Sequence, residues 1–69
     1  MEIKDSKTIW CKIRYYQQLY GVSNNLLAKS LNIQPRTLKN YDKNAQHLTI
    51  GQIESFLGEY NLTIEELLS

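Results

Sequence analysis

The chain has 69 residues, 42% of them hydrophobic, and a formal net charge of +1, so it can form at most one small domain, residues 1–69. No apolar run approaches the ~20 residues that cross a bilayer, and the charged N-terminus lacks a signal-peptide core, so we expect no membrane association. A single cysteine, Cys11, excludes an intrachain disulfide and a four-cysteine zinc site, which favours a reducing cytoplasm.

The first predicted helix runs from about Ser6 to Tyr20 and ends at Gly21, because glycine readily adopts the left-handed conformation that follows many helices. Its buried stripe is marked by apolar residues at helical spacing, namely Ile9, Ile13 and Tyr16. Residues 1–5 precede this helix, and we expect them to be disordered because nothing in the sequence ties them down.

Residues 24–41 predict two short helices joined by a tight turn. The second helix spans roughly 24–31, and Ser23 before it offers an N-cap hydroxyl. The third spans about 35–42 and begins with Pro35, which suits a position where no backbone N–H is needed. Four apolar residues flank a small residue and the turn: Leu27, Leu31, Leu38 and Tyr41 around Ala28 and Asn32. This is the pattern of a helix-turn-helix unit, whose second helix can enter the major groove of DNA.

Two further helices are predicted at about 50–60 and 64–68. Thr49 and Thr63 each stand three residues before a Gln or Glu, which is the spacing of a capping box. The longer helix carries one buried stripe, formed by Ile50, Ile53, Phe56, Leu57 and Tyr60. No strand-like alternation persists, so the expected fold is all-α with five helices.

The charges are unevenly distributed along the chain. All eight Lys and Arg residues lie between Lys4 and Lys43, which gives the segment before His47 a charge of +5 and the segment after it a charge of −4. One end of the domain could then face phosphates; the alternative is a neutral protein with two solvated faces. His47 has no second His or Cys at ligand spacing, so no metal site is expected.

From about Ile13 to Leu68 the chain resembles the phage repressor and Cro type of helix-turn-helix domain, the XRE or lambda-repressor-like family. The residues that carry the resemblance are Leu27-Ala28, Asn32-Ile33, Leu38, Tyr41-Asp42-Lys43-Asn44, Ile53, Phe56-Leu57 and the run from Leu62 to Leu67. The resemblance implies a compact five-helix domain whose helix-turn-helix unit lies at about 24–41.

Two features depart from the family pattern. Asn32 and Asn44 stand where the family has glycine, and asparagine enters the left-handed region more readily than other non-glycine residues. Gln17 and Asp42 stand where the family often pairs an Arg with a Glu. We therefore expect a hydrogen bond between a neutral and a charged group in place of an ion pair.

The resemblance also implies which residues contact DNA. Those expected at base edges are Gln34, Pro35, Arg36, Thr37 and Asn40, and those expected at phosphates are Asn24, Lys39, Lys43 and the backbone of Asn44. Arg can bridge guanine O6 and N7, Asn or Gln can bridge adenine N6 and N7, and apolar groups can contact the thymine methyl. The alternatives are that Gln34 is only a weak N-cap and that the Thr37 hydroxyl bonds back to its helix. An N-terminal arm could also reach DNA through Lys4 and Lys7.

The sequence thus predicts a sequence-specific DNA-binding transcription regulator, Cro-like or a small repressor, in a bacterial or phage-infected cell. It would bind a near-palindromic operator as a homodimer, with Leu67 and Leu68 at the dimer interface. The alternative is a protein-interaction module on the same fold, such as an anti-repressor or modulator that binds a partner repressor. Low net charge and the missing Arg–Glu pair favour this alternative. No acid–base pair, metal cluster or phosphate loop is recognisable, so neither an enzyme nor a cofactor is expected.

Overall fold

The structure of the protein is a computed structural model, in which residues 6–68 are described. Within that range the chain forms helices and no strand: α1 (Ser6–Leu19), α2 (Asn24–Leu31), α3 (Pro35–Lys43), α4 (Ile50–Glu59) and α5 (Ile64–Leu68). The all-α prediction is therefore confirmed, and each helix begins where the sequence indicated. The expectation that residues 1–5 are disordered, and with it an arm through Lys4, lies outside the described residues; Lys7 lies in α1.

Three helix starts use the side chains that the sequence indicated. The Ser23 hydroxyl accepts a hydrogen bond from Leu26 N at 3.2 Å. Thr49 forms a complete capping box with Gln52, with bonds of 3.0 and 3.1 Å. Thr63 makes the same two bonds with Glu66. These caps satisfy N–H groups that have no partner inside the helix.

Two helix ends rely on a left-handed residue, as predicted. Gly21 has φ 66° after α1, and Asn32 has φ 60° and ψ 43° after α2. The next residue then folds its N–H back onto the helix, as with Ile33 N to Ala28 O at 3.0 Å. Asn61, with φ 54°, plays the same part after α4, which the sequence analysis did not anticipate.

The prediction for Asn44 was wrong. This residue is extended, with φ −156°, so it does not replace a left-handed glycine. Its Oδ1 atom accepts a hydrogen bond from Gln46 N at 3.0 Å, which turns the chain after α3. Asparagine can do either, because its side chain imitates a backbone turn as readily as its backbone enters the left-handed region.

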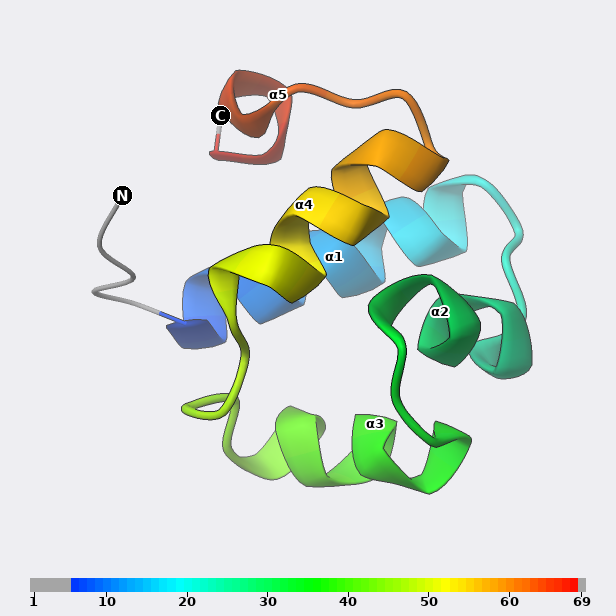
Figure 1. Cartoon of the computed structure of the whole chain (residues 1–69), viewed down its shortest axis with the longest axis vertical. Coiled ribbons are helices and arrows are strands. Elements are labelled where there is room, and N and C mark those ends of the chain that lie inside the picture. Colours follow the sequence, from blue (N-terminus) through cyan, green and yellow to red (C-terminus); the bar gives the residue numbers. More distant parts are fainter. Residues whose placement is uncertain (1–5, 69) are drawn as a thin grey trace.

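The helices enclose one core. α2 packs against α3 and α4, and α1 packs against α5. Figure 1 shows α4 lying in front of α1, with α5 at one end of the molecule and α3 at the other. The fully buried side chains come from every helix: Ile13, Leu27, Leu31, Leu38, Ile53, Phe56 and Leu67. None of the helices in residues 6–68 is long and apolar enough to cross a membrane.

Candidate nucleic-acid interface

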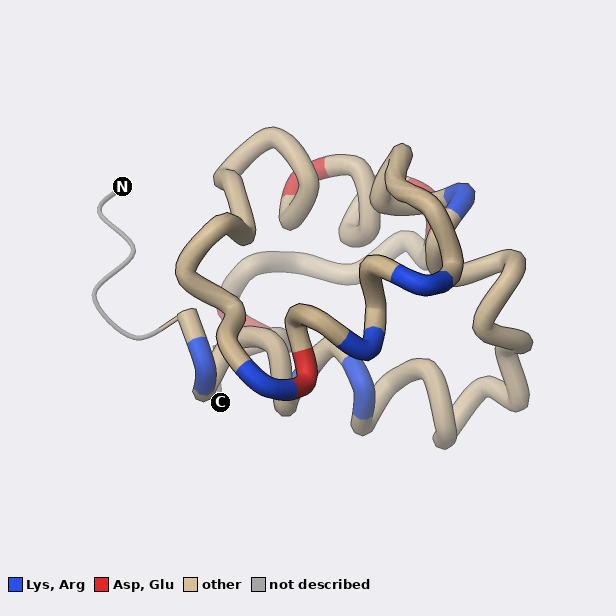
Figure 2. The backbone as a smooth tube through the Cα atoms, turned by 90° about the horizontal axis from the view of Figure 1, so that it is seen from below, with Lys and Arg blue, Asp and Glu red and all other residues tan. Residues whose placement is uncertain are grey.

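α3 has one buried face and one exposed polar face. Leu38 and Tyr41 are buried in the core. On the opposite side, Arg36, Asn40 and Lys43 are exposed, and their i, i+4, i+7 spacing places them along one line of the helix. In Figure 1 this helix lies at the lower edge of the molecule with no other element below it. Figure 2, seen from that side, shows Lys and Arg positions spaced along the near part of the chain.

The start of α3 carries side chains that are not used for capping. Gln34 is the N-cap residue, with φ −78° and ψ 147°, but its side chain makes no cap hydrogen bond and is exposed. Pro35 occupies the first turn, as predicted. Thr37 is half-buried, and within residues 6–68 its hydroxyl makes no hydrogen bond to the helix. Gln34 is therefore a weak N-cap, as its alternative held, with its side-chain amide left free, whereas Thr37 does not make the bond to its helix that was its alternative within the described residues.

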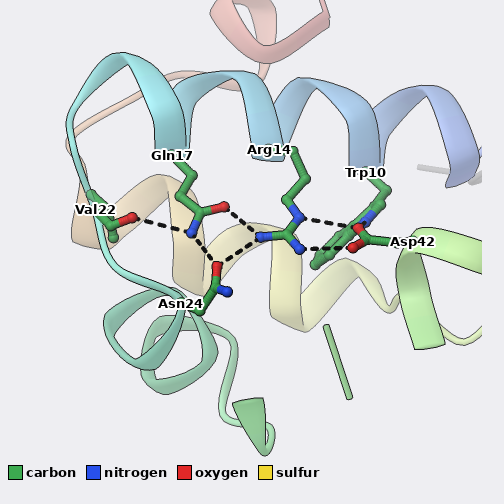
Figure 3. A network of polar contacts seen from close by, with 6 residues as sticks. All are labelled: Trp10, Arg14, Gln17, Val22, Asn24 and Asp42. Carbon is green, nitrogen blue, oxygen red and sulfur yellow. Dashed lines mark hydrogen bonds and ion pairs between the residues drawn. The ribbon is translucent and has the colours of Figure 1, made fainter. Parts of the chain in front are cut away.

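An ion pair joins α1 to α3, contrary to the expectation from Gln17. Arg14 Nε and Nη2 donate to the two carboxylate oxygens of Asp42 at 3.0 and 2.8 Å (Figure 3). The buried Trp10 indole Nε1 donates to Asp42 Oδ1 at 2.7 Å, and the Trp10 ring packs edge-on against Tyr41, with centroids 5.2 Å apart. The Arg14 guanidinium lies 5.6 Å from the Trp10 ring centroid, within range of a cation–π contact. α3 is thus fixed to α1 at its C-terminal end.

The same contacts set the charge state of Asp42. Hydrogen bonds from Arg14, assisted by the Trp10 bond and the Arg14 charge, lower the pKa of Asp42 below its usual value, although partial burial opposes them. The carboxylate remains ionised and directed toward α1. Of the four charged residues of α3, the acid is therefore neutralised by Arg14, and three cations remain: Arg36, Lys39 and Lys43.

Gln17 serves a different purpose from the one expected: it connects α1 to the start of α2. It is buried, and its Nε2 donates to Val22 O at 3.1 Å and to Asn24 Oδ1 at 2.8 Å. Arg14 Nη1 donates to Gln17 Oε1 at 2.7 Å and to Asn24 Oδ1 at 3.0 Å (Figure 3). Because Asn24 Oδ1 is held in this way, its Nδ2 amino group, a donor, is left outside the network at the N-terminus of α2.

The residues predicted to contact DNA come from the first turn of α2 and the segment 34–44. Eight of them are exposed and Thr37 is half-buried; the exposed ones are Asn24, Gln34, Pro35, Arg36, Lys39, Asn40, Lys43 and Asn44. Arg14 and Trp10 were missed as residues that hold this site. Their i, i+4, i+7 spacing with Gln17 was the available signal, because it places all three on one face of α1.

The two residues predicted at a dimer interface, Leu67 and Leu68, differ in burial. Leu67 has 0% of its surface exposed and belongs to the chain's own core, so it cannot present a surface to a second copy. This corrects the prediction for Leu67. Leu68 is 52% exposed and remains on the surface. The sequence of a short helix does not show whether an apolar residue faces the chain's own core or a partner, so Leu67 and Leu68 could not be told apart.

The chain was also compared with known proteins. No protein-family model, curated protein or solved structure is significantly similar to it. Within residues 6–68 no group of three or more His, Cys, Asp or Glu side chains could hold a metal ion.

Proposed function

We propose that this protein is a sequence-specific DNA-binding regulator that inserts α3 into the major groove. The observation that carries the proposal is the uncovered face of α3, on which Arg36, Asn40 and Lys43 form one line. The opposite face of the same helix is packed firmly against the core. An α-helix fits the major groove, where base edges can be distinguished by hydrogen bonds. The finer proposal for the fold is that α2 and α3 are a helix-turn-helix unit of the phage repressor and Cro type.

The exposed side chains at the start and middle of α3 suit base recognition. Arg36 can bridge the O6 and N7 atoms of guanine, and Asn40 can bridge N6 and N7 of adenine, each contact contributing about 1–3 kcal/mol of discrimination. Gln34 and Thr37 lie next to them at the N-terminal end, and Pro35 offers an apolar surface to a thymine methyl. Because Gln34 makes no capping bond, its amide is free for this purpose.

Phosphate contacts fit the flanks of the same surface. Lys39 and Lys43 are exposed cations on α3, and Asn24 Nδ2 lies at the N-terminus of α2, where backbone N–H groups and the helix dipole favour an anion. Such contacts set the position of a protein on the duplex without reading its sequence. A bacterial or phage-infected cell is the setting that this proposal implies.

The alternative, a module that binds a partner repressor, loses the support that came from a missing ion pair. It drew on the expected absence of an ion pair between the first and third helices, and Arg14–Asp42 forms that pair. Low net charge remains, as do the exposed apolar side chains of Leu19 and Leu26, on which a partner could dock. Three cations, Arg36, Lys39 and Lys43, nevertheless lie on α3.

The test is selection of binding sites from random duplex DNA, followed by a salt titration of the winning site. We expect a near-palindromic site and an affinity that falls linearly in a log–log plot against salt. Arg36→Ala should lower affinity and relax the preference at one base pair, and Asn40→Ala should relax it at another.

The matched control is Arg36→Lys, which retains the charge but cannot form the bidentate hydrogen bonds by which arginine recognises guanine. It should keep the salt dependence of the wild type while losing the base preference. Lys39→Ala should weaken binding to all sequences and reduce the salt slope by about 1. Unchanged base preference in both Arg36→Ala and Asn40→Ala would overturn the proposal, as would the absence of any enriched sequence.

A further inference from the structure

A groove lies between α2 and the C-terminal end of α4, away from the outer face of α3. One side is formed by Val22, Leu26 and Lys29, and the other by Gly58, Glu59 and Tyr60. Leu26 is 56% exposed, so more than half of a large aliphatic side chain that lines the groove is left uncovered by the described residues. No residue of segment 34–44 lines the groove.

The groove carries one charge of each sign, on opposite sides. Lys29 on α2 and Glu59 on α4 are both exposed, and within residues 6–68 neither takes part in an ion pair. A groove of a single sign would repel an identical copy. A two-fold axis can bring the α2 side of one copy against the α4 side of the other, and each Lys29 would then face the partner's Glu59.

Gly58 provides a second, independent observation. It lies one residue before the end of α4 with an ordinary helical φ, and a Cβ atom built there would meet nothing within 4 Å. The folded chain therefore has no need of glycine at this position, although glycine weakens a helix relative to most residues. Glycine does allow another surface to approach the backbone closely, and here it lines the α4 side of the groove, across from the exposed Leu26.

We propose that this groove is the dimer interface of the protein, in which Leu26 of each copy seats over Gly58 of the other and two Lys29–Glu59 pairs close the edges. None of the residues proposed to contact DNA lines the groove, so the dimer leaves both α3 helices uncovered. It is offered in place of the α5 interface predicted from sequence, where Leu67 is buried.

Sedimentation of the protein over a wide range of concentrations, without DNA, tests the proposal. The wild type should show a concentration-dependent dimer. Lys29→Glu alone and Glu59→Lys alone should each raise the dissociation constant at least ~10-fold, because each turns two attractive pairs into two repulsive ones. The double variant K29E/E59K should restore the dimer, which neither a folding defect nor general loss of charge can imitate.

Two further variants separate the groove from other surfaces. Gly58→Gln should favour the helix, and so keep the chain folded, while its side chain fills the groove and abolishes the dimer. Leu68→Ser changes an equally exposed leucine on α5 and should leave the dimer unchanged, whereas Leu26→Ser should weaken it. A monomer at every concentration would overturn the proposal, as would a dimer that survives Gly58→Gln or dissociates only with Leu68→Ser. Because no DNA is present, each of these results leaves the proposed DNA binding untouched.

Discussion

Replacing Asp42 tests whether the contacts between α1 and α3 stabilise the fold. Asp42→Asn removes the charge but keeps an oxygen that can accept from Trp10 and Arg14. Asp42→Ala removes both. The two variants therefore separate the ion pair from the hydrogen bond that satisfies the Trp10 indole.

The magnitude follows from burial. The side chains of Arg14 and Asp42 are 27% and 43% exposed, so solvent screens their attraction, but both donor–acceptor pairs are short. Exposed ion pairs contribute about 0.2–1 kcal/mol, and bidentate Arg–carboxylate pairs lie near the upper end of that range. Asp42→Asn should therefore lower the unfolding free energy by about 1 kcal/mol. Trp10 is only 3% exposed. Stranding its N–H adds the cost of a buried unsatisfied donor, so Asp42→Ala should cost about 2–3 kcal/mol in total.

The effect should depend on pH in one direction. Since the folded-state pKa of Asp42 is lowered below the ordinary value of 3.8, the folded state favours the ionised form. The stabilisation is then fully present above the unfolded-state pKa and is lost as the pH falls through the lower folded-state pKa. The difference in unfolding free energy between wild type and Asp42→Asn should therefore be constant near neutral pH and shrink as the solution becomes acidic.

Urea unfolding followed by fluorescence of the single tryptophan, Trp10, measures both variants. Each 1 kcal/mol should also lower Tm by about 4–8 °C in a domain of this size. Glu54→Gln is the control, because Glu54 is an exposed acid on α4 that forms no ion pair within residues 6–68. The reasoning fails if Asp42→Asn is no less stable than Glu54→Gln, or if Asp42→Ala is no less stable than Asp42→Asn.

Two further predictions concern single residues at helix ends. Asn32→Ala should lower the unfolding free energy by about 1 kcal/mol, because the left-handed conformation is less favourable for alanine than for asparagine. Asn32→Gly should change the unfolding free energy little, and an alanine variant as stable as the wild type in urea unfolding would contradict this. Gln34→Ser should raise the unfolding free energy by about 0.5–1 kcal/mol, because serine can cap α3 and Gln34 does not. If the Gln34→Ser variant is no more stable than the wild type in the same assay, the missing capping bond at the start of α3 does not limit the stability of the fold.

The helix boundaries could be predicted because their causes are local. Ser23 and Thr49 cap helices through residues three positions away, so a short stretch of sequence contains the whole interaction. Asn44 shows the limit of this reasoning. Its left-handed and turn-forming conformations are both open to an asparagine after a helix, and the following chain, which returns toward the core at Ala45, decides between them.

The polar face of α3 could be predicted from helical periodicity, but its attachment to α1 could not. Asp42 and Arg14 are 28 residues apart, and their contact depends on where the two helices cross. Position matching to the family pointed to Gln17, which lies almost one turn further along the same face of α1. The sequence supplied the correct face of the helix and the wrong residue on it, because registry between packed helices is a property of the assembled core.

The small net charge of the chain is a poor measure of the electrostatic potential at the surface of α3. Arg36, Lys39 and Lys43 lie on α3, whose acid is held by Arg14, while the four acids beyond His47 lie on α4 and α5. α5 is at the end of the molecule opposite α3 (Figure 1), so Glu65 and Glu66 are separated from the α3 cations along the long axis. Under the proposed function this dipole would turn α3 toward the phosphates during approach and direct the acidic end away from them. A small net charge and strong local attraction are then compatible, because the potential at the α3 surface depends on the nearest charges, and beyond about 10 Å salt screens the rest.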